Sequence, residues 1–71
     1  MEKWTADFIN NPDDAYKLIV EILYNGHDVA IIKKEDNALK IIWYANPNDL
    51  DVPFEWLLGL MNEAKKVLSA N

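Results

Sequence analysis

The feature that most limits the fold of this chain is the absence of cysteine from a sequence of only 71 residues. Without cysteine there is no disulfide bond and no cysteine-based zinc site. A chain of this length buries only about 60% of the surface that its unfolded form exposes, so its stability is marginal. Stability must therefore come from burial of apolar side chains, either inside the fold or against another chain.

The composition supplies apolar side chains in excess. The hydrophobic share of the sequence is 51% and includes three tryptophans, which is not the composition of a disordered chain. We expect a single domain spanning residues 1–71.

The charge balance excludes several classes of partner. Twelve acidic residues stand against seven lysines with no arginine, and the net charge is −5. Arginine is the residue that most often binds phosphate groups and guanine bases, and this chain has none. Nucleic acid and anionic membrane surfaces are therefore not expected partners.

No apolar run approaches the ~18 residues of a membrane span, and the N-terminus lacks a secretory signal. We expect a cytoplasmic protein, and its use of isoleucine, asparagine and lysine suits an AT-rich bacterial or phage genome.

Residues 12–25 are expected to form a helix. Asn11 can cap it, Pro12 suits its first turn, and Gly26 suits the left-handed residue that ends a helix. Its apolar arc is about 200° wide, twice the stripe that a surface helix needs. Residues 1–11 are expected to form a short helix or a docked arm.

Residues 28–45 predict a β-hairpin, because two runs rich in isoleucine, valine and aromatic residues flank a polar turn. Asp36 and Asn37 tolerate positive φ and are the expected two-residue loop. With that loop, one face carries Ala30, Ile32, Leu39, Ile41, Trp43 and Ala45, and the other carries Val29, Ile31, Ile42 and Tyr44. A three-residue loop would shift this register.

Residues 53–69 predict a second helix, since the residue before Pro53 avoids the helical region. Its main apolar stripe is expected to face the core and consists of Phe54, Leu57, Leu58, Met61, Ala64 and Leu68. The expected fold class is therefore α+β, with the order helix–β-hairpin–helix (αββα).

The sequence offers little for catalysis. His27 is the single histidine, and we interpret it as a turn residue at the start of a strand. Asp28 is the one nearby residue that could assist it in catalysis. No set of three or four metal ligands has a suitable spacing. We expect no enzyme activity, no cofactor and no metal site.

The apolar excess points instead to protein binding. The expected partner-binding residues are Trp56, Leu60 and Val67 on the second helix, with Tyr44, Ile31 and Ile42 on the outer hairpin face. The expected function is a regulatory, inhibitory or assembly module that forms a homodimer or binds another protein. A structural homo-oligomer, such as a virion component, and an acidic mimic of nucleic acid are alternatives. A further alternative is that the N-terminal arm covers the excess apolar surface within one chain.

Overall fold

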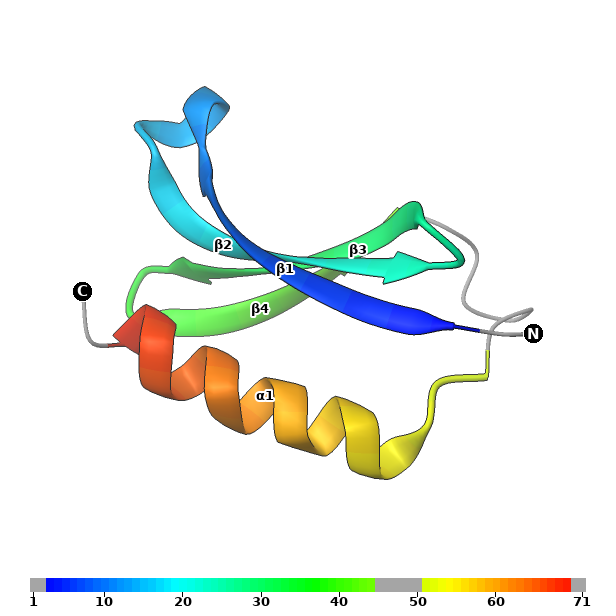
Figure 1. Ribbon diagram of the computed structural model, residues 1–71. Helices are drawn as coiled ribbons and strands as arrows, with labels where there is room; N and C mark the ends of the chain where they lie inside the picture. The colour runs from blue at the N-terminus through cyan, green and yellow to red at the C-terminus, as the bar shows by residue number, and fades with distance from the viewer. Residues whose placement is uncertain (1–2, 45–50, 70–71) are drawn as a thin grey trace.

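A four-stranded antiparallel sheet followed by one helix forms the protein (Figure 1) in a computed structural model that describes residues 3–44 and 51–69. The strands pair in sequence order, so each strand lies beside the next one in the chain. The elements are β1 (Trp4–Asn11), the 3-10 turn η1 (Pro12–Asp14), β2 (Lys17–Tyr24), β3 (His27–Glu35), β4 (Ala38–Trp43) and α1 (Phe54–Ser69).

The expected helix–hairpin–helix order is wrong, because most of residues 12–25 forms a strand rather than a helix. Asn25 and Gly26 have φ values of 51° and 83°, as in the two-residue turn that most often joins antiparallel strands. The pair therefore closes a β2–β3 hairpin instead of ending a helix. A strand that is apolar on both faces gives the same wide arc when its residues are placed on a helical wheel.

Residues 1–11, expected as a helix or an arm, contain strand β1 instead, which pairs along its whole length with β2. The helix-start residues Asn11 and Pro12 do begin a helix after β1, but that helix is only the single 3-10 turn η1. The Asn11 side chain accepts a hydrogen bond from the Asp13 backbone N–H at 3.0 Å, and Pro12 opens η1. Ala15 and Tyr16 then take φ values of 53° and 57°, which turn the chain back into β2.

The expected β3–β4 hairpin is present, with Asp36 and Asn37 as its two-residue loop at φ values of 54° and 67°. As predicted, the register also places one set of side chains toward the helix: Ala30, Ile32, Leu39, Ile41 and Trp43. Ala45, the sixth residue of that predicted face, lies outside the described residues. Val29 departs from the prediction: a β-bulge near Ile22 and Leu23 makes it an extra residue, and it is buried in the core.

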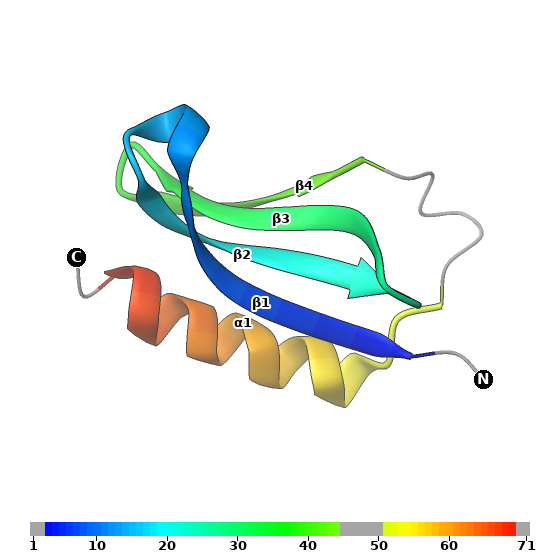
Figure 2. The ribbon, with the colours of Figure 1, turned by 45° about the horizontal axis from the view of Figure 1, so that its top comes forward.

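The helix covers one face of the sheet and packs on β2 and β3 (Figures 1 and 2). The core residues are Val20, Ile22, Val29, Ala30, Ile32, Ala64 and Leu68. On α1, Trp56, Leu60, Ala64 and Leu68 face this core at intervals of four residues.

The helix therefore presents a different stripe from the expected one. Phe54, Leu58 and Met61 are exposed, and only Ala64 and Leu68 of the predicted stripe are buried. Both stripes are apolar, so hydrophobic spacing did not distinguish them. Packing decides which stripe faces the core. Ala64 is fully buried beneath the sheet, and its small side chain lets the helix approach the sheet closely.

Candidate functional site

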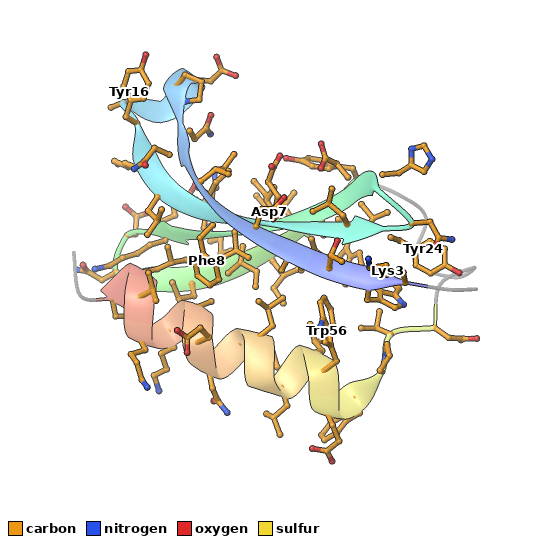
Figure 3. All side chains as sticks on the ribbon, viewed as in Figure 1. Lys3, Asp7, Phe8, Tyr16, Tyr24 and Trp56 are labelled. Atoms are coloured by element: carbon orange, nitrogen blue, oxygen red, sulfur yellow. The ribbon has the colours of Figure 1, made fainter. Side chains whose placement is uncertain are left out.

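The face of the sheet opposite α1 is the main candidate site, and we call it the outer face. Successive residues of a strand point to opposite sides of a sheet. Phe8 and Trp56 lie between the sheet and the helix, whereas Asp7 lies on the other side (Figure 3). By this alternation and the strand register, the apolar residues of the outer face are Ile9, Ile19, Leu23, Ile31, Ile42 and Tyr44.

The apolar residues of the outer face alternate with charged ones, because the Ile31–Ile42 pair continues the row of Asp7 and Glu21, whereas the Ile9–Ile19 pair lies one row further along the strands, toward Lys33 and Lys40. Ile9 lies opposite Ile19 on the β1–β2 pair, and Ile31 lies opposite Ile42 on the β3–β4 pair. Directly opposite side chains on one face of an antiparallel pair are in contact. Ile42 and Tyr44 are exposed, with Tyr44 at 61%, whereas Ile19 is buried, at 5%. The apolar surface of this face is therefore open to solvent mainly at Ile42 and Tyr44.

Three carboxylates lie near one another on strands β1, β2 and β3 of the outer face, and we call them the acidic cluster. Asp7 lies directly opposite Glu21, and the bulge brings Asp28 opposite Leu23, next to Glu21. The pKa of Glu21 is raised, first by partial burial and then by repulsion from Asp28 and Asp7. The acidic cluster is therefore a region of like charge.

Three lysines lie nearer the β1–β2 and β3–β4 turns than the acidic cluster does, and we call Lys17, Lys33 and Lys40 the lysine end. Lys33 is directly opposite Lys40, and Glu35 bridges the two with N–O distances of 3.1 and 2.7 Å. The hydrogen bond from Lys40, followed by that from Lys33, lowers the pKa of Glu35 to about 2. One carboxylate is thus shared between two ammonium groups, which leaves this end positive.

The β1–β2 hairpin, which carries Lys17, rises above the rest of the outer face (Figure 1), whereas Lys33 and Lys40 lie on β3 and β4. Pairing between β2 and β3 begins where Val20 lies opposite Ile32, and beyond that point the β1–β2 hairpin bends up, away from the helix (Figure 1). Tyr16 stands at its tip and is 68% exposed (Figure 3). A hollow of about 830 Å³ separates the two hairpins, with Lys17 and Lys34 among its lining residues.

The loop that carries Tyr16 is held by its own hydrogen bonds. The Tyr16 backbone N–H donates to the Asn11 carbonyl at 2.8 Å, and the Asn10 side-chain amide donates to the Tyr16 carbonyl at 3.0 Å. These bonds fix Ala15 and Tyr16 in a left-handed conformation that costs free energy for residues other than glycine. The raised tip is consequently a defined structure.

The residues predicted on the second helix lie elsewhere than expected. Trp56 and Leu60 pack against the core, and Val67 is partly buried. The Trp56 ring is centred 5.9 Å from that of Trp4, which lies 4.8 Å from Tyr24. The structure therefore does not bring Trp56, Leu60 and Val67 together as an exposed patch.

The exposed apolar stripe of the helix consists instead of Phe54, Leu58 and Met61. The sequence carries its signal, an i, i+4, i+7 spacing, but that spacing was attributed to the core. By contrast, the residues predicted on the hairpin lie together on the outer face. Ile31 and Ile42 are paired, and the Tyr44 N–H donates to the Val29 carbonyl at 2.8 Å.

The polar side chains that could take part in catalysis are dispersed over the sheet. His27 lies opposite Tyr24 and Asp28 opposite Leu23, so their side chains leave opposite faces of the sheet. Thr5 is separated from Asp28 by strand β2. Among residues 3–44 and 51–69, no three histidine or acidic side chains are grouped so that they could hold a metal ion.

The helix in the described part of the chain is not long and apolar enough to cross a membrane. Comparison with models of protein families, with curated proteins and with solved structures finds no match to this chain.

Proposed function

We propose that this chain is a small, non-enzymatic protein-binding module and that the outer face is its docking surface. A sheet with one helical layer normally presents polar side chains to water on its other face. Here Ile31, Ile42 and Tyr44 lie on that face, and Ile42 and Tyr44 are exposed. Apolar side chains exposed among charged ones are typical of a surface that another protein covers.

Regulation, inhibition and assembly are all compatible with this role, because each needs binding and no catalytic group. A cytoplasmic location is part of the proposal, since the chain is acidic and has no cysteine. The exposure of Ile42 and Tyr44 on this face is the single observation that supports the proposed function most strongly.

The test compares two double variants on opposite sides of the molecule. Ile42→Ser with Tyr44→Ser removes apolar surface from the outer face, and Phe54→Ser with Leu58→Ser removes it from the exposed helix stripe. All four side chains are exposed, so both variants are expected to fold, which circular dichroism checks.

Binding is measured by calorimetry with a purified partner, first found by capture from the native host, and self-association by sedimentation velocity. The outer-face variant is expected to lose at least ten-fold in affinity while the helix variant stays within about two-fold. Loss confined to the helix variant, or no effect of either variant on a real complex, would overturn the assignment of the outer face.

A further inference from the structure

We propose that the hollow between the two hairpins binds the C-terminal carboxylate of an extended peptide segment of a partner protein. The hollow lies where the sheet divides, and we call the space between the diverging strands the split (Figure 1). Pairing of β2 with β3 stops at Val20 and Ile32, whereas the β1–β2 pairing continues to Lys17 and the β3–β4 pairing to Glu35. Residues 17–19 and 33–35 therefore form two strand edges that face each other across the split.

Backbone groups of both edges point into the split. Residues of an antiparallel strand direct their N–H and C=O groups alternately to one neighbouring strand and to the other. Asn25 bonds toward β1, so the even-numbered residues of β2 direct these groups toward β3. The Val29 carbonyl bonds toward β4, so the even-numbered residues of β3 direct theirs toward β2. Leu18 and Lys34 consequently offer backbone donors and acceptors to an occupant of the split.

The split is positively charged, although the chain as a whole carries a net charge of −5. Lys17, Lys33 and Lys34 line the hollow, and Asp36 is the single acid among its described lining residues. Glu35 already bridges Lys33 to its neighbour on β4. Among the described side chains, none forms an ion pair with Lys17 or Lys34. Two ammonium groups are thus available to bind an anion.

The shape of the split selects the end of a chain. Its volume of about 830 Å³ equals that of about five extended residues, each with a rise of about 3.3 Å, a strand spacing of about 4.8 Å and a sheet thickness of about 10 Å. At Val20 and Ile32 the two strands pair, which leaves no room for a third strand between them. An extended segment directed toward this pair must end there. The lysines attract a terminal carboxylate and repel a terminal ammonium group.

A peptide end matches the split better than a free small anion does. Each edge offers a carbonyl as well as an N–H, and the addition of a peptide strand uses both, whereas a small anion uses only donors. Leu18, Ile19 and Leu68 also line the hollow and supply an apolar floor for the last side chain of the peptide. Neither Ile42 nor Tyr44 lines the hollow, so this second site goes beyond the proposed function of the outer face.

The first experiment compares matched probes by NMR titration of the ¹⁵N-labelled chain. The probe is an acetylated hexapeptide of alternating threonine and alanine that ends in leucine with a free carboxylate. The controls are the same peptide with a C-terminal amide, and sodium acetate. The free-carboxylate peptide is expected to bind in the millimolar range and to shift the backbone amide signals of Leu18 and Lys34 most.

Both controls are expected to bind at least ten-fold more weakly, because each lacks either the charge or the backbone of the probe. Equal binding of the amide peptide would remove the role of the carboxylate, and equal binding of acetate would make the split a site for small anions. Either result overturns the proposal. It is also overturned if saturating peptide leaves the signals of Leu18 and Lys34 unchanged, or if no binding is detected up to the solubility limit of the peptide.

The second experiment removes the two available ammonium groups. Lys17→Ala with Lys34→Ala is expected to weaken binding of the free-carboxylate peptide at least ten-fold. Lys65→Ala with Lys66→Ala makes the same change in net charge on exposed helix positions and is expected to stay within about two-fold. Circular dichroism checks folding, and Lys17→Gln with Lys34→Gln keeps most of each side-chain stem if the alanine pair unfolds the chain. Equal binding by the folded split variant and the helix variant would overturn the proposal.

A third comparison separates the split from the outer face. Ile42→Ser with Tyr44→Ser is expected to bind the free-carboxylate peptide within about two-fold of the natural chain, because neither residue lines the hollow. Loss of peptide binding in this variant would place the peptide on the outer face and overturn the split as its site, while the proposed function would still hold. Loss of a protein partner in the same variant, with peptide binding intact, would support both sites.

Discussion

At the scale of single residues, the turns show where the backbone is under strain. Among residues 3–44 and 51–69, five non-glycine residues have positive φ: Ala15, Tyr16, Asn25, Asp36 and Asn37. Asparagine and aspartate adopt this conformation readily, because their short polar side chains bond to the local backbone. Ala15 and Tyr16 have no such compensation, so the β1–β2 turn is the strained one.

Substituting Ala15→Gly is expected to stabilise the protein by about 1 kcal/mol, because the left-handed φ of 53° costs glycine nothing. The midpoint of urea unfolding, at unchanged slope, measures this effect. Ala38→Gly is the matched control, since Ala38 lies in a strand, and it is expected to destabilise by about 0.5–1 kcal/mol. A loss of stability from Ala15→Gly would contradict the assigned backbone conformation.

The carboxylate of Glu35 gives a prediction about pH. Its folded pKa is about 2, below the ordinary value of 4.5, so its contribution to stability is present above pH 4.5 and is lost as the pH falls toward 2. Lys40→Ala removes the strongest cause of the shift and is expected to raise the pKa of Glu35. Carbon-detected NMR titration measures both values, and an unchanged pKa would contradict the shared bridge.

At the scale of elements, the sequence predicted the β3–β4 hairpin because two signals agreed. Strand-forming residues flank Asp36 and Asn37, and the register that follows from a two-residue loop placed Ile41 and Trp43 on the correct face. For residues 12–25 the signals disagreed. The Asn11 and Pro12 helix start outweighed Asn25–Gly26, which is a strong hairpin signal, and the wide apolar arc was the sign that a two-faced strand was present.

The position of the last helix was predictable, but its orientation was not. Trp56 and Phe54 both lie on apolar stripes, and the stripe that faces inward depends on the sheet that the helix meets. Because residues 12–25 were expected to form a helix, the prediction lacked strand β2, on which the last helix packs. The assignment of Trp56 to an exposed patch was based on that missing partner.

The structure makes Trp56→Ala a test of this orientation. Removal of a partly buried ring that packs on Trp4 is expected to destabilise folding by about 2–4 kcal/mol. Phe54, at 72% exposed, is the control, and Phe54→Ala is expected to change the free energy of unfolding by less than about 0.5 kcal/mol. Thermal unfolding of both variants measures the difference; equal effects would mean that the helix presents another face.

At the scale of the whole molecule, the sequence predicted an apolar excess without saying which surface exposes it. Tyr44, Ile31 and Ile42 were placed correctly because the hairpin register was correct. The grouping of Asp7, Glu21 and Asp28 was not foreseen, because it joins three strands of which two were unrecognised. A charge pattern across a sheet exists only once the register is known.

Glu21→Gln is expected to stabilise the fold. The folded pKa of Glu21 is raised, so its ionised form opposes folding, and the stability of the natural chain falls as the pH rises through that pKa. Glutamine removes the repulsion and is expected to stabilise the protein at pH 7 by about 0.5 kcal/mol.

Thermal unfolding at pH 7 measures the effect of Glu21→Gln on stability. Lower stability than that of the natural chain would contradict the repulsion among the three carboxylates.

The sequential order of the strands has a consequence for how the chain reaches its native state. Each strand pairs with its neighbour in the sequence, so the sheet assembles through short-range closures, which cost little chain entropy. Low contact order of this kind favours rapid folding. The helix then docks across the longest connection, so sheet formation is expected to precede closure of the core.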